Sequence, residues 1–368
     1  MLEKHLNDKY DFYYNEILSR VYYKEKKQDE YKLLSSYKLN SIKRELNNND
    51  IKCSVSDLKS LLESDYVPKR NPFEEYFNSL PEWDNVDYLS ELCKTVKTSN
   101  DQEYFWAFKK WIVAMVACAL YPNITNQTIF IFTGKQGIGK TTWLKKLVPK
   151  KLNGYFFSGL INPSNKDTTL LMSEKLIVNL DELASLNNKQ MDAFKEMVTK
   201  SVITERRAYA HFSEDYIRRA SFVGSSNHYE ILSDVTGNRR FLVFEAQDID
   251  YECNIDMDKV YSQVMYILNN TDFQYHFVGD DITRIERNNM MYKQSNQLED
   301  WIGDLFEKPS DDEKNIRYMS ATDISLYISN NRRSYGKLNV QEIGKIMTSS
   351  DYARKKIKGS WKYVVITK

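Results

Sequence analysis

The stretch that most constrains the fold is "TIFIFTGKQGIGKTTWL", residues 128–144. Its β-branched and aromatic start is typical of a strand, and a helix is predicted from Lys140 or Thr141. The loop between them matches G-x-x-x-x-G-K-[ST], in the strand–loop–helix context that this motif requires. Glycines let the backbone curl so closely that its N–H groups point at phosphate oxygens. A chance glycine-rich turn is the alternative, and the context disfavours it.

This loop predicts ATP and Mg²⁺ as cofactors. The Lys140 ammonium is expected at the β- and γ-phosphates, and the Thr141 hydroxyl is expected to ligate Mg²⁺. The helix N-terminus adds partial positive charge at the same place. The residues predicted to bind the nucleotide follow one another along the loop: Gly134, Gly137, Ile138, Gly139, Lys140, Thr141 and Thr142.

A second apolar run, "LIVNLDEL", ends in adjacent carboxylates, Asp181 and Glu182. Asp181 is predicted to hold Mg²⁺ through its water shell. Glu182 is predicted to orient and deprotonate the attacking water. The alternative is that both carboxylates cap the following helix. Adjacent acids at this point favour a hydrolase over a kinase.

Two later segments carry further catalytic candidates. Asn227 ends the strand "RASFVGSSN" and is predicted to hydrogen-bond the attacking water or the γ-phosphate; an Asx turn is the alternative. Arg239 and Arg240 in "DVTGNRRF" are predicted to stabilise charge at the γ-phosphate, or else form a surface pair. Which arginine acts, and whether on its own site or a neighbour's, stays open at this level.

The segment between Glu182 and Asn227 predicts a basic hairpin. Its strands are expected over residues 201–210 and 216–224, with the turn at residues 211–215. Neighbouring arginines on a strand face opposite sides, so only part of them can meet nucleic acid, and Glu214 and Asp215 oppose a simple anion clamp. The candidate contacts to nucleic acid are Arg206, Arg207, His211, Phe212, Arg218 and Arg219.

Strands alternating with helices predict an α/β core with a parallel sheet. We expect four regions: a helical N-terminal module and linker (1–70), the ATPase core (71–250), an acidic helical connector (251–315) and a basic winged-helix-like module (316–368). In the last region, "SATDISLYI" and "NVQEIGKIMTSS" predict helices, and two short strands flank 358–360. Its basic charge suits a DNA backbone or a protein partner equally.

Composition excludes several classes of protein. The formal net charge of +1 provides no global attraction to nucleic acid, so contacts must be local. Four scattered cysteines without a CxxC pair argue against a zinc site or a disulfide framework. No signal peptide is recognisable, and "WIVAMVACALY" (111–121) is too short to cross a bilayer, so a cytoplasmic protein without membrane contact is expected.

Several motifs follow one another along the chain: the opening "NPFEEYFNSLPEWDN", then "GKQGIGKT", "IVNLDE", the basic hairpin, "FVGSSN" and "TGNRRF". In this order they resemble the virulence-associated E family. The resemblance covers about residues 70–250 and implies an AAA+ ATPase of the superfamily 3 helicase type, encoded by phages, plasmids and pathogenicity islands. It implies rings, usually hexamers, with ATP between subunits and Arg239 or Arg240 acting on a neighbour.

The resemblance also implies function and partners. It favours a replicative helicase or replication initiator of a mobile element, acting on single-stranded or forked DNA in a bacterial host's cytoplasm. Many relatives carry a primase-type domain upstream, whereas this chain has room only for a short N-terminal module, so priming activity is not expected of this chain. Replication proteins such as a primase are among the expected partners. The alternatives are a loader or remodelling switch that does not unwind, and a DNA-binding protein whose ATP site only locks assembly.

Overall fold

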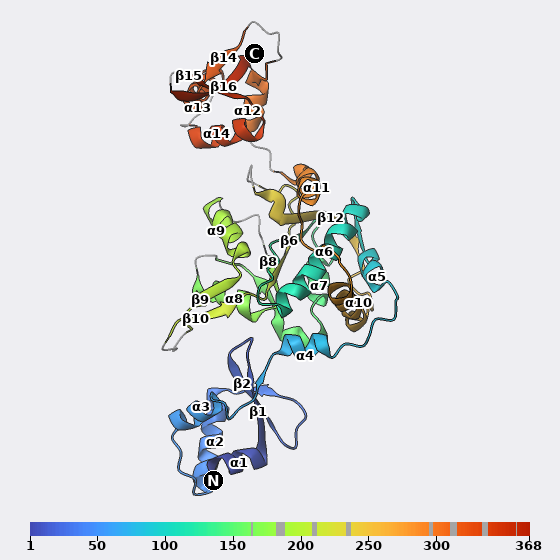
Figure 1. Cartoon of the computed structure of the whole chain (residues 1–368), viewed down its shortest axis with the longest axis vertical. Helices are drawn as coiled ribbons and strands as arrows, with labels where there is room; N and C mark the ends of the chain where they lie inside the picture. The colour runs from blue at the N-terminus through green and yellow to red at the C-terminus, as the bar shows by residue number, and fades with distance from the viewer. Residues whose placement is uncertain are drawn as a thin grey trace. The chain divides into compact units, whose positions relative to one another are not determined.

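The structure is a computed structural model that describes all 368 residues except 163–164, 182–187, 208–211, 233–236, 294–296, 310–314, 333–337 and 358 (Figure 1). The described chain divides into two compact units. The first comprises Met1–Asn227 and Phe244–Phe277, and the second comprises His228–Val243 and Val278–Lys368. Within the described residues, no helix is long and apolar enough to span a membrane.

The N-terminal part of the first unit mixes strands with helices. Strands β1 and β2 pair antiparallel in a sheet of order β3-β2-β1-β4. The prediction of a helical module is therefore wrong here. Tyr10 and Phe12 are buried on alternate positions of β1, and this period-two pattern is hidden in a polar, Tyr-rich sequence. The elements are α1 (Leu2–Lys9), β1 (Tyr10–Asn15), β2 (Arg20–Glu25), β3 (Lys32–Leu33), α2 (Ser36–Asn48), α3 (Val55–Leu62) and β4 (Lys69–Arg70).

A six-stranded sheet of order β5-β12-β6-β11-β8-β7 forms the centre of the chain. Strands β6, β11, β8 and β7 pair in parallel with one another in that order, whereas β5 runs antiparallel to β12. The predicted α/β fold with parallel strands is thus confirmed; β5 and β7 were not predicted. The strands are β5 (Val96–Thr98), β6 (Ile129–Thr133), β7 (Phe156–Gly159), β8 (Ile177–Asp181), β11 (Ser221–Ser225) and β12 (Phe241–Ile249).

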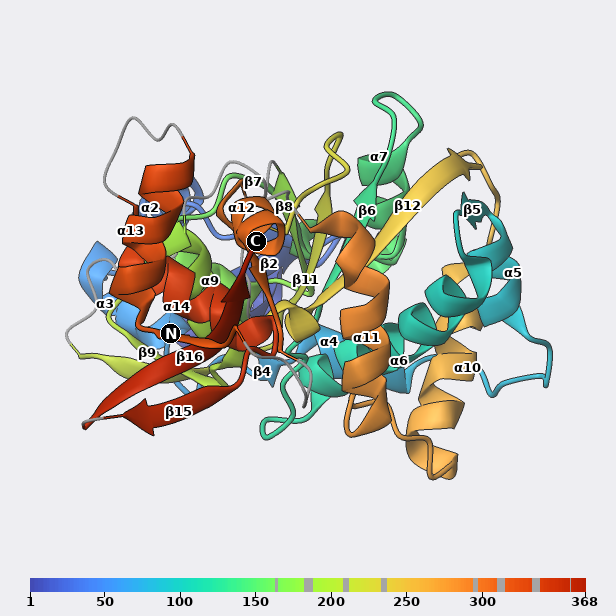
Figure 2. The same cartoon turned by 90° about the horizontal axis from the view of Figure 1, so that it is seen from above.

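Helix α6 (Asp101–Leu120) supplies much of the core of the first unit. Asn100 caps its start by accepting a hydrogen bond from the Glu103 N–H, and the helix is apolar nearly all round, as expected of a buried helix. Figure 2 shows it grouped with α5 and α10 beside the sheet. The other helices of this part are α4 (Pro72–Asn78), α5 (Tyr88–Lys94), α7 (Lys140–Lys146), η1 (Lys150–Tyr155), α8 (Lys166–Glu174), α9 (Asn188–Thr199) and α10 (Met257–Asn270).

Helix α10 lies in the region predicted to be an acidic connector. Its residues Val260, Tyr261 and Val264 are fully buried, and the helix packs against α5 and α6. The Tyr76 hydroxyl donates a hydrogen bond to Asp258 at the start of α10, at 2.7 Å. This half of the predicted connector therefore belongs to the core of the first unit. The predicted helix is present, but its burial depends on α5 and α6, which local spacing and net charge do not reveal.

A separate two-stranded hairpin, β9 (Val202–Glu205) paired antiparallel with β10 (Glu214–Ile217), precedes β11. We call it the central hairpin. It occupies the predicted place, but its strands are shorter than predicted. Arg218, Arg219 and Ala220 separate β10 from β11, so the return strand is not one continuous element.

The second unit ends in a small module with its own apolar core. Ser320 caps α13 through a capping box with Asp323, as the sequence predicts. Ile324, Ile343 and Val365 are completely buried in that core. The unit contains η3 (Asn238–Arg240), α11 (Asp280–Asn289), η4 (Met290–Tyr292), α12 (Gln297–Leu305), β13 (Phe306–Glu307), β14 (Arg317–Met319), α13 (Ala321–Asn331), α14 (Val340–Ser349), β15 (Arg354–Ile357) and β16 (Ser360–Thr367).

Candidate nucleotide-binding site

The loop after β6 has the backbone that the motif requires. Gly134, Gly137 and Gly139 have φ values of 131°, 85° and 89°, which side-chain-bearing residues rarely adopt. A Cβ on Gly134 would lie 2.4 Å from the Ala246 carbonyl oxygen, and one on Gly139 would lie 2.2 Å from the Tyr251 ring. The loop therefore curls against β12 and the segment after it, and at Gly134 and Gly139 this close approach leaves no room for a side chain.

Lys140 begins α7 at the end of this loop. Its ammonium donates hydrogen bonds to the carbonyl oxygens of Gly134 (2.8 Å) and Lys135 (2.7 Å) and to Asn227 Oδ1 (3.1 Å). The residue is only 6% exposed, and burial lowers the pKa of its ammonium. The structure thus brings together Lys140 and Asn227, two of the predicted catalytic residues, although 87 positions separate them in the chain.

Thr141 faces the same edge of the sheet. Its hydroxyl lies 3.0 Å from the Ser225 hydroxyl. Ser225 is the last residue of β11 and is the register partner of Asp181, the last residue of β8. The threonine and the carboxylate predicted to bind Mg²⁺ therefore flank one residue at the carboxyl ends of parallel strands, where ligands of such sheets usually bind.

Two residues that the sequence did not single out orient Asp181. The Ser158 hydroxyl donates to Asp181 Oδ2 (2.8 Å), and the Asn179 amide donates to Asp181 Oδ1 (2.7 Å) and to the Ser158 oxygen (2.8 Å). Asn179 is fully buried in β8. A buried polar residue two positions before a strand-end carboxylate shares its face, and this spacing could have indicated Asn179. Ser158 carries no such signal because β7 was not predicted.

These residues fit a nucleoside triphosphate with Mg²⁺. The glycines allow the positive φ values that the loop backbone needs to form a cradle, and Lys140 supplies a cation at its end. The Thr141 hydroxyl and the Asp181 carboxylate are the hard oxygen ligands that Mg²⁺ prefers. Ile138, half-buried, and Thr142, exposed, belong to the same loop and helix start. Glu182, the predicted general base, falls outside the described residues.

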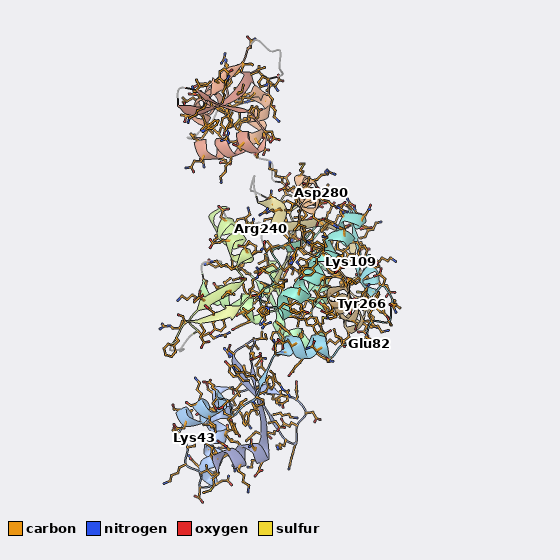
Figure 3. All side chains as sticks on the ribbon, in the orientation of Figure 1. Lys43, Glu82, Lys109, Arg240, Tyr266 and Asp280 are labelled. Atoms are coloured by element: carbon orange, nitrogen blue, oxygen red, sulfur yellow. The ribbon has the colours of Figure 1, made fainter. Side chains whose placement is uncertain are left out.

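Arg239 and Arg240 lie in the second unit, in the turn η3 before β12; Figure 3 labels Arg240. Gly237, with φ of 84°, precedes them. Asn289 at the end of α11 is buried, and its amide donates to the carbonyl oxygens of Asn238 (2.9 Å) and Phe241 (2.8 Å) on either side of the pair. Arg239 is exposed and Arg240 half-buried, and burial together with the Arg239 charge lowers the pKa of Arg240. Asn289 therefore fixes this turn, a role that the sequence did not indicate.

In the central hairpin, the described candidates differ sharply in their surroundings. Arg206 is exposed, and Phe212 is 78% exposed. Arg207 instead donates to Glu174 at the end of α8 and to the Leu18 carbonyl oxygen, and its guanidinium lies 4.8 Å from the centroid of the Tyr216 ring. His211 falls outside the described residues. Arg206 and Phe212 are thus exposed, whereas Arg207 is held within the protein.

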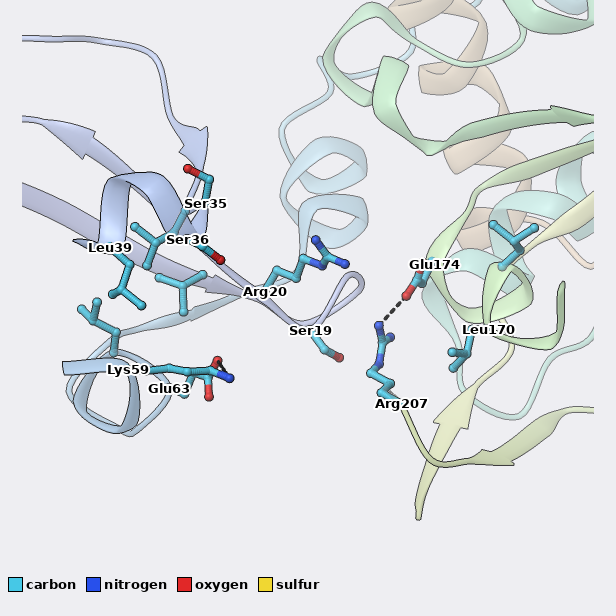
Figure 4. A pocket seen from close by; sticks show the side chains of 14 residues that line it. Ser19, Arg20, Ser35, Ser36, Leu39, Lys59, Glu63, Leu170, Glu174 and Arg207 are labelled. Atoms are coloured by element: carbon cyan, nitrogen blue, oxygen red, sulfur yellow. Dashed lines mark hydrogen bonds and ion pairs between the residues drawn. The ribbon is translucent and has the colours of Figure 1, made fainter. Parts of the chain in front are cut away.

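Arg207 also lines a cavity of about 580 Å³ (Figure 4). Ser19, Arg20 and Lys59 line it from the N-terminal part, and Leu170 and Glu174 line it from α8. Through the bonds of Arg207 to Glu174 and Leu18, the base of the central hairpin is tied to α8 and to the β1–β2 turn. The Asn15 amide, also from the N-terminal part, donates separately to the Tyr155 hydroxyl at 2.7 Å.

The prediction that Arg218 and Arg219 contact nucleic acid does not fit their positions. Arg218 is 0% exposed and donates to the carbonyl oxygens of Val198, Asn126 (2.6 Å) and Ala220 (3.3 Å). Arg219 is half-buried and donates to the Ala119 carbonyl oxygen at the end of α6. Carbonyl groups in the last turn of a helix lack partners within their own helix, and the two arginines donate to such groups at Val198 of α9 and Ala119 of α6. Sequence alone could not separate this pair from Arg206 and Arg207, because both read as adjacent arginines beside aromatic residues.

Comparison with known proteins gives a family but little else. None of the curated proteins matches the chain. Among solved structures, the apo C-terminal region of NrS-1 is 14% identical with a TM-score of 0.49, covering 100% of this chain and 98% of that one. The A form of the same apo region is also 14% identical, with a TM-score of 0.48 and the same coverage. Neither likeness reaches a TM-score of 0.5. The family model of the virulence-associated protein E-like domain matches residues 77–300, and the chain belongs to that family.

Proposed function

We propose that the protein is an ATP-hydrolysing motor on DNA, a replicative helicase or replication initiator of a mobile genetic element. The observation that carries this proposal is the meeting of Lys140 and Asn227 beside Thr141 and Ser225, at the carboxyl edge of a parallel sheet. Membership in the virulence-associated protein E-like family and the exposed Arg206 and Phe212 support the DNA part of the proposal.

In this proposal, the residues of the site have separate tasks. Lys140 and the backbone N–H groups of residues 134–142 bind the phosphates, and Thr141 and Asp181 hold Mg²⁺, which supplies positive charge to those phosphates. Ser158 and Asn179 keep the Asp181 carboxylate in position. Asn227 orients the attacking water, and Glu182 accepts its proton.

The proposal extends to assembly. Residues 71–250 form an AAA+ core of the superfamily 3 type, and residues 316–368 form a winged-helix-like module. Identical subunits assemble into a ring, usually of six. Arg239 or Arg240, held by Asn289, stabilises the charge that develops on the phosphates of a neighbouring subunit. DNA, single-stranded or forked, is the ligand of the central hairpin, and a primase is an expected partner.

The first test is ATP hydrolysis with and without single-stranded DNA. Lys140→Ala is expected to lower the turnover rate at least 100-fold, because a single preorganised charge at the reacting phosphates is worth about that much. Lys145→Ala, an exposed lysine on the same helix, is the control and should leave turnover unchanged. Retained turnover in Lys140→Ala would place the active site elsewhere. Turnover that is indifferent to DNA would favour the loader or remodelling switch.

A further inference from the structure

The second unit exposes a large aromatic side chain that its core does not use. Trp361 lies on β16 and is 61% exposed. The core of this module is formed by other residues, among them Ile324, Ile343 and Val365, and Trp361 is absent from it. The indole is thus largely exposed to solvent instead of lying in this core, and a large exposed aromatic side chain beside other ligand-binding groups can mark a binding surface.

Cations surround Trp361 on the same face of the hairpin formed by β15 and β16, which we call the C-terminal hairpin. Lys356 is the register partner of Trp361, and Arg354 is the register partner of Tyr363, two positions further along β16. Residues paired across strands share a face, as do residues two apart, so Arg354, Lys356 and Trp361 lie on one side. The Arg354 guanidinium is 5.8 Å from the Trp361 ring centroid.

The other face of this sheet repeats the combination. Lys355 lies 5.9 Å from the centroid of Tyr318, which is 40% exposed. The sequence from Tyr352 to Lys368 contains no acidic residue. Lys362, on this second face, forms an ion pair with Asp323 of α13 at 3.9 Å, so the cation that this face offers to a ligand is Lys355. The C-terminal hairpin is therefore basic on both faces and aromatic on both.

The combination of cationic and exposed aromatic side chains on this hairpin indicates the kind of ligand. Phosphate groups fit the cations, and an exposed indole fits the flat face of an unpaired base, which stacks without regard to base identity. In a duplex the bases are already stacked on one another, so a duplex could use the cations but not Trp361. An anionic membrane surface would also fit cations and Trp, but Arg354 beside the ring keeps one side of the indole polar.

We propose that the C-terminal hairpin binds single-stranded nucleic acid, with a base stacked on Trp361 and phosphates bound by Arg354 and Lys356. The inference deepens the proposed function by naming a strand-binding site in the second unit. It does not depend on the nucleotide site, since every residue involved lies within the second unit.

The test is fluorescence anisotropy of the full chain with a labelled 12-nucleotide oligothymidylate, without ATP. It is run in an Arg206→Ala/Phe212→Ala background so that the central hairpin does not mask the effect. Trp361→Ala is expected to weaken binding by about 5- to 100-fold, the usual value of one base–aromatic stack, while Trp361→Phe should retain most of the affinity. The matched control is Leu326→Ala, since Leu326 is 59% exposed on α13 of the same module; it should bind like the background.

Salt dependence and ligand type separate stacking from charge. Arg354→Gln/Lys356→Gln should reduce the slope of log affinity against log salt by about 0.7 for each lost phosphate contact. Trp361→Ala should leave that slope unchanged and should not alter binding of a blunt 12-base-pair duplex. An oligouridylate in place of oligothymidylate reports whether the site prefers RNA or DNA.

Two results would overturn the inference: equal oligothymidylate affinity in Trp361→Ala and the background, or an equal loss in Leu326→Ala. Co-sedimentation of the protein with anionic lipid vesicles that depends on Trp361, without Trp361-dependent oligonucleotide binding, would assign the surface to a membrane and would also overturn it. Failure of the ATPase proposal looks different, because Lys140→Ala would then keep its turnover while the oligonucleotide results stayed as expected. Each proposal can thus fail without the other.

Discussion

At the scale of single residues, the nucleotide loop separates two effects that glycine has on a protein. Gly134 and Gly137 both have positive φ, but their surroundings differ. A Cβ on Gly134 would meet the Ala246 carbonyl oxygen at 2.4 Å, whereas a Cβ on Gly137 would have no atom within 4 Å. Gly134 is therefore required by both conformation and space, and Gly137 by conformation alone.

This contrast gives a stability prediction. Gly137→Ala should cost about 1–2 kcal/mol of unfolding free energy, the cost of a left-handed conformation for a residue with a side chain. Gly134→Ala should cost clearly more, because a backbone carbonyl cannot rotate away as a side chain can. Urea denaturation of the two variants measures the difference. Equal losses would mean that β12 shifts freely away from the loop.

The four hairpin arginines show what residue-level sequence reasoning can and cannot do. The motif around Lys140 predicts a phosphate-binding role, and the structure places the residue at the start of α7, with its ammonium against the glycine loop. Arg206 and Arg218 each belong to an adjacent pair, yet one is exposed and the other 0% exposed. The burial of Arg218 depends on its bonds to Val198 in α9 and Asn126 after α6, which lie 20 and 92 positions away in the sequence, and no local pattern encodes such contacts.

At the scale of elements, Arg218 joins the link between β10 and β11 to the C-terminal end of α9 and the loop after α6. Arg218→Met keeps the volume but leaves these buried carbonyl groups without a donor, so it should lower the unfolding free energy by at least about 2 kcal/mol. Arg206→Met, the exposed counterpart, should change it by less than about 0.5 kcal/mol. Urea denaturation followed by circular dichroism compares them. A stable Arg218→Met protein would show that these carbonyl groups find other donors.

The N-terminal helices α1 and α2 are joined by a carboxylate. Burial raises the pKa of Glu45, but hydrogen bonds from Lys9, Tyr10 and His5 outweigh it and lower the pKa to about 2. A carboxyl group with a lower pKa in the folded state stabilises the protein above its unfolded pKa, here near 4.5. The contribution is lost as pH falls from about 4.5 to about 2.

We therefore expect Glu45→Gln to have a smaller loss of stability than the wild type across that pH window. Urea midpoints at pH 5, 4 and 3 for the two proteins measure the difference. Glu30→Gln, which removes an exposed carboxylate from the same part of the chain, controls for net charge. If all three proteins lose stability in parallel, the Glu45 cluster is not coupled to folding.

At the scale of the whole molecule, the central question is whether the nucleotide site is completed by another subunit. If Arg239 or Arg240 acts on a neighbour, each inactive subunit disables more than its own site. When wild-type protein is mixed with Arg239→Ala/Arg240→Ala protein, ATP turnover should then fall faster than the fraction of wild-type subunits in the mixture falls. Arg287→Ala, an exposed arginine on α11 of the same unit, is the control and should have no such effect. A proportional loss would contradict a shared site.

The sequence by itself determined the glycine loop, the parallel strands that end at it, and the capped helices of the C-terminal module. Each of these depends on neighbours a few positions apart, so a local pattern is sufficient to predict it. Only the tertiary structure decided that Ser158 and Asn179 orient Asp181, that Asn289 holds the Arg239–Arg240 turn, and that Arg218 is interior. Those contacts join distant segments, and the free energy of burying a polar group depends on partners that only the folded chain brings within hydrogen-bonding distance.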